Sequence, residues 1–284
     1  MSQDLQIKQE FFDALTRFVS SLDEHVSTDD GQWSIKGFID VCRNIYTISS
    51  DTKIISKILE IHLFPRILSF AEEIGYRVVL AEHQNYYPDI SFVHGNSEHI
   101  KFAVDFKTTY RLPDYPEFCN GFTLGSHGEY FVNRSSSKNI QFPYSRYQGH
   151  FRLGIIYSRH REEVDETRTY RFEELHSISS VIKDFKFFFT EKWRIASDKS
   201  GSGNTANIGS INRIADITSG RGVFSDLGEE WFDDYWVNYG KITITEDSGK
   251  TKQIRNLKDF VVFRGGDVRL IVPKARKIGL RRKQ

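Results

Sequence analysis

The chain has little cysteine and almost no net charge. Cys42 and Cys119 are its only cysteines among 284 residues, which excludes a disulfide framework or a cysteine-rich zinc site and is typical of a protein in the reducing cytoplasm. No motif supports a catalytic thiol at either position. The net charge is +1, whereas a protein that binds polyanions non-specifically is normally more basic. Any nucleic-acid function must therefore depend on local charge.

Targeting signals and long apolar runs are also missing. The chain begins Met-Ser-Gln-Asp-Leu, without a basic region followed by an apolar one. No apolar run approaches the roughly 18 residues of a membrane span, and neither an internal repeat nor a long low-complexity linker is visible. We expect a globular protein that is neither exported nor embedded in a membrane, built as one elaborated domain over residues 1–284.

Two acids and a lysine, in Pro88-Asp89 and Asp105-Phe106-Lys107, lie on either side of a short polar turn. The segment 86–110 predicts one antiparallel hairpin, because strand-forming residues flank the turn residues His-Gly-Asn-Ser. Side chains alternate between the two faces of a strand, so Asp105 and Lys107 share one face. If Asp89 lies opposite Asp105, the midpoint of the pair falls at residue 97, inside the turn. The register that closes the hairpin thus also pairs the two acids.

Like charges held together in a sheet are costly unless a cation neutralises them. Mg²⁺ is the natural candidate, because in nucleases it is held by one or two carboxylates and a substrate phosphate. Lys107 would orient the attacking water or stabilise charge on the phosphate. Alternatively, Asp89 and Asp105 are solvated residues on an open sheet face, and Lys107 is their surface ion-pair partner. The motif alone leaves both interpretations open.

Periodicity predicts the flanking elements. Apolar residues at helical spacing predict a first helix over 9–22 and a second from about 50 to 74, which Pro65 should kink or divide. Glu60 lies beside the apolar stripe of the second helix, either as an acid of the site or as an ordinary exposed glutamate. Further predictions are loops at 27–32, 111–117 and 197–210, a basic stretch at 134–138, strands at 151–157 and 183–189, and a helix at 229–239. The chain ends in a basic tail at 270–284, which is either a solvated end or a phosphate clamp.

The loop at 197–210 is rich in glycine, serine and asparagine. It lacks the G-K-[ST] ending of a nucleotide-binding P-loop. Asparagine can make bidentate contacts to adenine, and glycine allows backbone amides to approach bases closely. A DNA-reading loop is consistent with this composition, and so is a flexible surface connection.

Several segments, in the same order and with similar spacing, together resemble the type II restriction endonucleases of the PD-(D/E)xK nuclease superfamily. These segments are 50–53, 84–89, 105–110, 122–125, 137–140 and 201–210, within a region from about residue 45 to about residue 240. The glycine- and asparagine-rich segment 201–210 is the most specific of them. The resemblance implies an α/β fold with a restriction-endonuclease-like core, in which a mixed β-sheet carries the catalytic antiparallel hairpin and is flanked by helices. The N-terminal helix and the basic tail would be extensions of this core.

The resemblance also assigns roles to residues. It implies that Asp89, Asp105 and Lys107 form the catalytic centre, with Glu60 as an auxiliary acid near the metals. Asp89, Asp105 and Glu60 would be the ligands of Mg²⁺. Residues in contact with DNA would be Gly201, Ser202, Gly203, Asn204, Thr205 and Asn207 in the major groove, Gln84 and Asn85 near the minor groove, Lys138 near the backbone, and also Thr108 and Thr109.

The implied activity is Mg²⁺-dependent hydrolysis of double-stranded DNA by a homodimer, with a blunt central cut in GATATC that leaves 5′-phosphates. A methyltransferase of the same specificity would protect the host DNA. The chain departs from the family pattern at Ala206, which replaces a threonine, at 126–130, and at both ends. A structure-specific or repair nuclease with the same centre, a catalytically inactive DNA-binding protein and an unrelated α/β domain are the alternatives.

Overall fold

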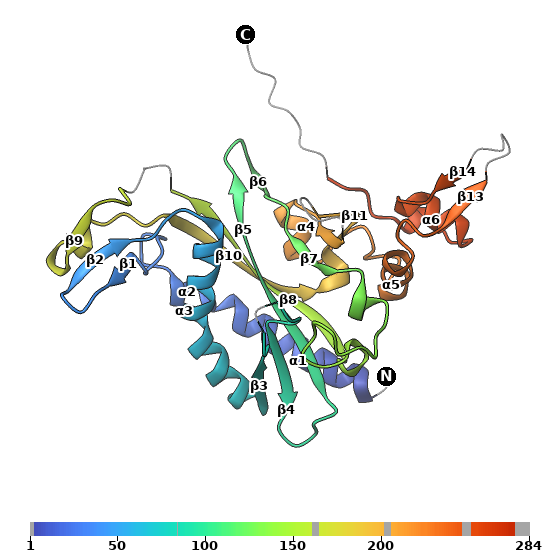
Figure 1. The fold of residues 1–284 in the computed structure, drawn as a ribbon, viewed down its shortest axis with the longest axis horizontal. Helices are drawn as coiled ribbons and strands as arrows, with labels where there is room; N and C mark the ends of the chain where they lie inside the picture. Colours follow the sequence, from blue (N-terminus) through green and yellow to red (C-terminus); the bar gives the residue numbers. More distant parts are fainter. Residues whose placement is uncertain (1–2, 84, 161–164, 202–205, 246–250, 276–284) are drawn as a thin grey trace, which may run out of the picture.

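The computed structural model describes residues 3–83, 85–160, 165–201, 206–245 and 251–275. Its centre is a six-stranded mixed sheet in the order β10-β8-β5-β4-β3, with β6 paired to β5. β5 and β8 run parallel, and the other neighbours are antiparallel. The strands are β3 (Tyr76–Leu80), β4 (Ile90–His94), β5 (Lys101–Leu112), β6 (Tyr115–Cys119), β8 (Gly149–Arg159) and β10 (Ile182–Glu191). The expected mixed α/β fold is confirmed (Figure 1).

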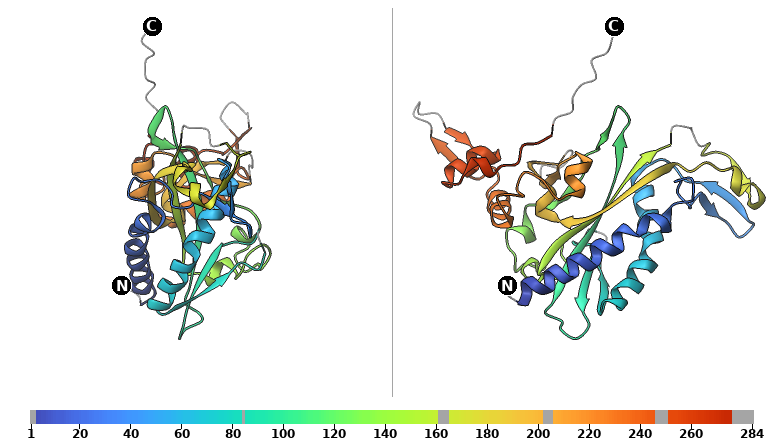
Figure 2. Two further views of the ribbon diagram at one scale, coloured as in Figure 1. Left: turned by 90° about the vertical axis from the view of Figure 1, so that its left-hand side faces the viewer. Right: turned by 180° about the vertical axis from the view of Figure 1, so that it is seen from behind.

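Helices cover one face of this sheet. They are α1 (Gln3–Ser20), the short α2 (Leu22–Val26) and α3 (Thr52–Glu73) (Figure 2). Their buried apolar residues share one core with those of the sheet. Phe11 of α1 stacks on Phe102 of β5 with a ring-centroid distance of 4.1 Å, inside a buried cluster that also contains Leu59 of α3. The apolar side of β5 is thereby fixed, and its polar side chains point to the other face.

α3 begins where the sequence predicts. Asp51 caps it, because its side chain accepts hydrogen bonds from the backbone N–H groups of Lys53 and Ile54, at 2.8 and 3.2 Å. Of the two expected effects of Pro65, a kink or a division of the helix, the division is wrong, since the helix continues to Glu73. Proline removes only one backbone donor, and the turns on both sides are held by buried apolar residues such as Leu63 and Ile67.

A second core lies on the other face of the sheet. It joins Ala103 of β5 and Ile156 of β8 to residues of a three-stranded sheet in the order β11-β12-β7 and of later helices. The elements are β7 (Thr123–Ser126), β11 (Ala196–Ser200), β12 (Asn207–Ser210), α4 (Ile214–Thr218), α5 (Glu229–Val237) and α6 (Leu257–Phe263). The predicted aromatic helix at 229–239 is confirmed as α5.

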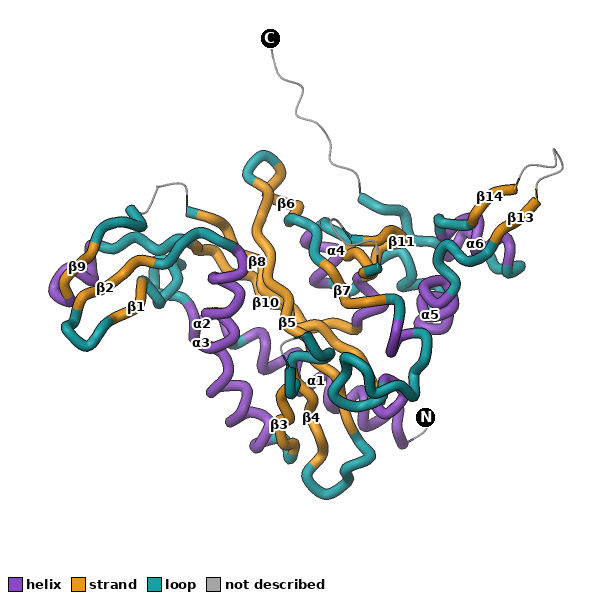
Figure 3. Tube along the Cα trace, viewed as in Figure 1, coloured by secondary structure: helices purple, strands orange, loops and turns teal. Residues whose placement is uncertain are grey.

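Smaller elements lie at the periphery (Figure 3). They are the sheet of β1 (Gly37–Ile39), β2 (Asn44–Thr47) and β9 (Thr169–Arg171), the pair β13 (Thr243–Thr245) and β14 (Thr251–Gln253), and the 3₁₀ turns Glu129–Phe131, Tyr144–Arg146, Phe172–Ser177, Lys192–Ile195 and Val268–Leu270. Across the described ranges, no helix is both long and apolar enough to cross a membrane.

The loop predictions for two segments are partly wrong, because both segments contain strands. The segment 111–117 is the tip of a β5–β6 hairpin, in which Arg111 pairs with Cys119. β6 tolerates Pro116 because it lies outside the main path of the sheet. The segment 197–210 begins in β11 and ends in β12. Gly209 therefore belongs to a strand whose backbone approaches β11 closely, which composition alone does not distinguish from a loop.

Candidate active site

The β4–β5 hairpin has the predicted register. β4 and β5 pair Ile90 with Val104 and Phe92 with Phe102, and this register places Asp89, directly before β4, opposite Asp105. The backbone N–H of Phe106 donates a hydrogen bond of 2.7 Å to Asp89 Oδ2. The hairpin backbone itself therefore fixes the first acid beside the second.

Asp105 and Lys107 lie on the same face, as strand alternation predicts. Lys107 Nζ is 2.5 Å from Asp105 Oδ2, and the carboxyl groups of Asp105 and Asp89 are hydrogen-bonded to each other. Asp105 is only 6% exposed. Two acids and an amine thus converge at a largely buried position, and the interpretation of separate solvated surface residues is wrong.

The two acids differ in proton affinity. Burial and then the charge of Asp105 raise the pKa of Asp89 to about 7, although Lys107 and the Phe106 N–H act in the opposite direction. Burial acts to raise the pKa of Asp105 as well, but Lys107 and Arg152 outweigh it and hold that pKa well below its usual range. A buried and a half-buried carboxylate that lie together form an oxygen donor set suited to a hard divalent cation.

This site opens into a cavity of about 950 Å³ between the hairpin and α3. Asp89 and Lys107 line it together with Lys53 and Lys57 of α3 and Thr108 of β5. Lysines on the wall of a cavity suit a substrate with a phosphate backbone. The cavity therefore gives a polyanion access to the acid pair.

Glu60 lies on the α3 side of the same cavity. Its carboxylate pairs with Lys57 at 2.8 Å. In the ranges that the structure describes, no three histidine, cysteine, aspartate or glutamate side chains come together as a metal-binding group. The structure thus brings Asp89, Asp105 and Lys107 together and leaves Glu60 apart from them.

The expected DNA-contact residues occupy different environments. Thr108 lines the cavity, and Asn85 is exposed just before the hairpin. Thr109 is buried and donates a 2.6 Å hydrogen bond to the Asn120 carbonyl, which is a structural role. Lys138 is exposed and pairs with Glu129 at 3.2 Å. Gln84, Ser202, Gly203, Asn204 and Thr205 lie outside the described residues.

The strands that flank the glycine- and asparagine-rich segment hold its two ends together. The Gly201 N–H donates to the Asn207 carbonyl at 2.8 Å, and Asn207 pairs with Ser126 of β7. A Cβ atom at Gly209 would lie 2.7 Å from the Lys199 carbonyl oxygen, so this close approach of β11 and β12 requires glycine.

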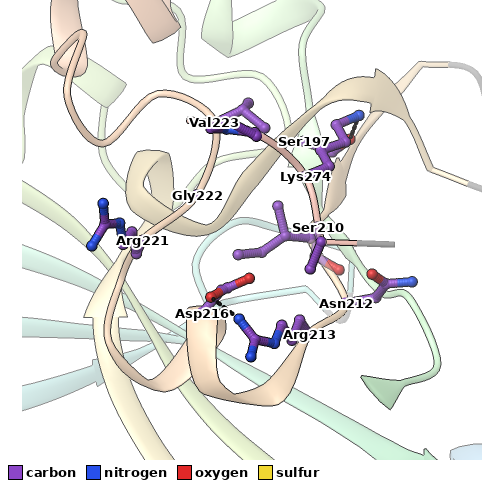
Figure 4. A pocket seen from close by; sticks show the side chains of 12 residues that line it. Ser197, Ser210, Asn212, Arg213, Asp216, Arg221, Gly222, Val223 and Lys274 are labelled. Atoms are coloured by element: carbon purple, nitrogen blue, oxygen red, sulfur yellow. Dashed lines mark hydrogen bonds and ion pairs between the residues drawn. The ribbon is translucent and has the colours of Figure 1, made fainter. Parts of the chain in front are cut away.

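A smaller cavity, of about 270 Å³, lies beside β11 and β12 (Figure 4). Arg213, Arg221 and Lys274 are its basic lining residues. Lys274 forms an ion pair with Asp198 and a 3.1 Å hydrogen bond with Ser197. The one described lysine of the predicted phosphate clamp is therefore already neutralised by an acid, and residues 276–284 of the tail lie outside the described part of the chain.

Sequence reasoning missed Arg152, which lies beside Asp105 on the neighbouring strand. Arg152 is fully buried, and its Nε is 3.5 Å from Asp105 Oδ2. The available signal was a single charged residue within the apolar run 151–157, which predicted a strand. A buried charge in such a strand requires an anionic partner.

The mixed sheet, the acid pair and the lysine define a restriction-endonuclease-like nuclease. A family model described as restriction endonuclease EcoRV matches residues 29–265, and the chain belongs to this family. The type II restriction enzyme EcoRV of Escherichia coli is 36% identical over 231 residues, which cover 81% of this chain and 88% of that relative. The chain is accordingly a type II site-specific deoxyribonuclease that acts on DNA, and enzymes of this class generally use a divalent metal.

Proposed function

We propose that the protein is a dimeric, Mg²⁺-dependent endonuclease that cuts double-stranded DNA at the centre of GATATC and leaves blunt ends with 5′-phosphates. The observation that carries the proposal is the convergence of Asp89, Asp105 and Lys107 on the hairpin. The target follows from the similarity to EcoRV and from the segment 201–210, in which Ala206 is a departure that could shift the preference.

In the proposed mechanism Asp89 and Asp105 hold the cation, whose charge offsets the negative charge that develops on the phosphate. Lys107 donates a hydrogen bond either to the attacking water or to a phosphate oxygen, and its ion pair with Asp105 keeps Nζ at the site. The buried hairpin positions these groups before DNA arrives. Positioning and electrostatics supply most of the acceleration, as in other phosphoryl transfers. Glu60, on the opposite wall, is proposed as an auxiliary acid that acts once DNA is bound.

Recognition is proposed to fall to Gly201–Asn207 in the major groove and to Gln84 and Asn85 near the minor groove. β11 and β12 hold the ends of the first segment close together, which fixes where it enters a groove. Lys138 and Thr108 are proposed as contacts to the backbone. The unit that performs this work is proposed to be one elaborated domain.

A twofold-symmetric target calls for two symmetric copies of the chain, so we propose that a homodimer binds one duplex. A nuclease that cuts a short DNA sequence would also cut the DNA of its own cell. The protein is therefore proposed to act beside a methyltransferase of the same specificity.

Digestion of a sequenced plasmid, followed by sequencing of the product ends, tests this proposal. The purified protein should give discrete fragments only when Mg²⁺ is present, with every end between GAT and ATC. An Asp89→Asn variant is the matched control and should leave the plasmid intact. Discrete ends at another sequence would correct the target alone. Degradation without preferred ends, or cutting confined to branched DNA, would favour a structure-specific nuclease, and specific binding without cutting would favour an inactive DNA-binding protein.

A further inference from the structure

Arg152 of β8 lies beside Asp105, on the strand next to β5, and its side chain is buried in the candidate active site. The parallel register of β5 and β8 pairs Asp105 with Arg152, and the Arg152 side chain is 0% exposed. Its Nη2 donates a 2.6 Å hydrogen bond to the Leu124 carbonyl, and its Nη1 donates to the Phe151 carbonyl at 2.8 Å. The guanidinium is therefore held in one position.

The charge of Arg152 is directed at Asp105. Nε lies 3.5 Å from Asp105 Oδ2, in the one ion pair that Arg152 forms within the described ranges. Nε itself has no hydrogen-bond acceptor in the described part of the chain. A fully buried arginine needs a counter-ion, and the candidate metal ligand is that counter-ion.

The balance of charge at the site follows. With both acids ionised, Asp89 and Asp105 contribute two negative charges, while Lys107 and Arg152 contribute two positive ones. On the cavity wall the charges of Glu60 and Lys57 also cancel. The free site thus has no net negative charge with which to attract a divalent cation.

We propose that Arg152 is a positioning residue that holds Asp105 in place as a fixed counter-charge and makes firm binding of the divalent cation depend on a DNA phosphate. The inference rests on the proposed function, because it takes Asp89 and Asp105 as the cation ligands. A phosphate at the site supplies the missing negative charge. Metal and DNA therefore bind cooperatively, and each raises the affinity for the other by the same factor.

The hydrogen bond to Leu124 also connects Arg152 to the strands that flank the proposed DNA-reading segment. Leu124 lies in β7, whose neighbouring residues Thr123 and Ser126 pair with Gly209 and Asn207 of β12. Arg152 therefore fixes Asp105 relative to β7, which pairs with β12, the strand that ends the segment proposed to read DNA.

Calorimetric titration with Ca²⁺ at about pH 8.5, above the ordinary carboxyl range, tests the proposal. Ca²⁺ takes the same kind of oxygen ligands as Mg²⁺. The wild type, Arg152→Met and Arg152→Lys are titrated alone and in complex with a short duplex centred on GATATC, and a gel confirms that the duplex stays uncut. Thermal unfolding verifies that each variant is folded.

Free wild-type protein should bind Ca²⁺ at least tenfold more weakly than its DNA complex does. Free Arg152→Met should bind Ca²⁺ about tenfold more tightly than free wild type, and DNA should add little further affinity. Arg152→Lys should keep the weak binding of the free wild type. Loss of a merely structural residue would weaken binding, so the expected tightening is specific to the counter-charge.

Unchanged or weaker Ca²⁺ binding by folded, free Arg152→Met would overturn the inference. If that variant does not fold, the wild-type titrations alone test the inference. Equal Ca²⁺ affinity of the wild type with and without DNA would also overturn the inference. Plasmid cleavage keeps the two proposals apart. A wild type that cuts GATATC but shows no effect of Arg152 leaves the proposed function standing, whereas a wild type that cuts no DNA removes the proposed function itself.

Discussion

Asp89 Oδ2 accepts a hydrogen bond of 2.7 Å from the backbone N–H of Phe106, the residue between the second acid and the lysine. This bond ties a loop carboxylate to the neighbouring strand at the point where Asp105 and Lys107 project into the site. A change in the register of the hairpin would break the bond and separate the two acids at the same time. The chemistry of the site is thus a direct consequence of strand pairing.

The two acids should respond differently to the same substitution. Asp105→Asn and Asp89→Asn are both expected to lose Mg²⁺-dependent cleavage by at least about 10²-fold, because each removes a charged side chain that is proposed to bind the cation. Asp105→Asn should also lower stability by about 3–5 kcal/mol, since it leaves the buried Arg152 without its counter-ion. Denaturant unfolding beside a plasmid assay measures both effects. Equal stability of the two variants would contradict the buried pairing.

Protonation of Asp89 should make stability depend on pH. Its pKa is raised to about 7 in the folded protein, above the unfolded value of about 3.9. The folded state therefore binds the extra proton, and this stabilisation is complete below about pH 4 and is lost as the pH rises through about 7. Asp89→Asn should remove this part of the pH profile in thermal unfolding without metal. A wild-type profile that Asp89→Asn leaves unchanged between pH 5 and 8 would contradict the assignment.

The effect of Mg²⁺ on thermal stability is an independent test of the protonation of Asp89. Because cation and proton compete for the carboxylates, Mg²⁺ with target DNA should raise the melting temperature more at pH 8 than at pH 6.

Gly209 should support DNA binding because it allows the backbones of β11 and β12 to approach closely. Gly209→Ala would place a Cβ 2.7 Å from the Lys199 carbonyl oxygen, and the strain, about 1–3 kcal/mol, would push β11 and β12 apart. Affinity for the target duplex should fall, as measured by fluorescence anisotropy. Gly121→Ala is the matched control, since its Cβ would meet no atom within 4 Å. Equal loss of affinity in both variants would argue against the role of Gly209.

Asn204 carries the proposed reading of base edges. Asn204→Ala should lose about 1–3 kcal/mol of discrimination for each base contact it makes. Cleavage rates on the target and on single-base variants measure this loss. Unchanged discrimination would remove Asn204 from recognition.

The hairpin could be predicted from the sequence because the information is local. A turn, two alternating strands and the position of the acids about the turn determine which side chains meet, and the observed register confirms this. The start of α3 and the aromatic helix α5 were predictable for the same reason, since capping and periodicity are local signals.

Arg152 could not be placed in this way. Its contact with Asp105 depends on the parallel pairing of β5 with β8, which is decided by the order of strands in the sheet and not by any short pattern. The strands at the ends of the segment 197–210 were missed for a similar reason. They form by pairing with each other and with β7, which is distant in sequence, while the glycine content of the whole segment indicates a loop.

The central claim is that Asp89 and Asp105 bind one divalent cation at the scissile phosphate. Anomalous diffraction from crystals of the protein with a GATATC duplex and Mn²⁺ tests it most directly. The account predicts a Mn²⁺ peak bound to a carboxylate oxygen of each aspartate and to a phosphate oxygen, at distances near the 2.1 Å of Mg²⁺–oxygen bonds. A fully bound duplex with no peak between the two aspartates, or with the peak elsewhere, would contradict it.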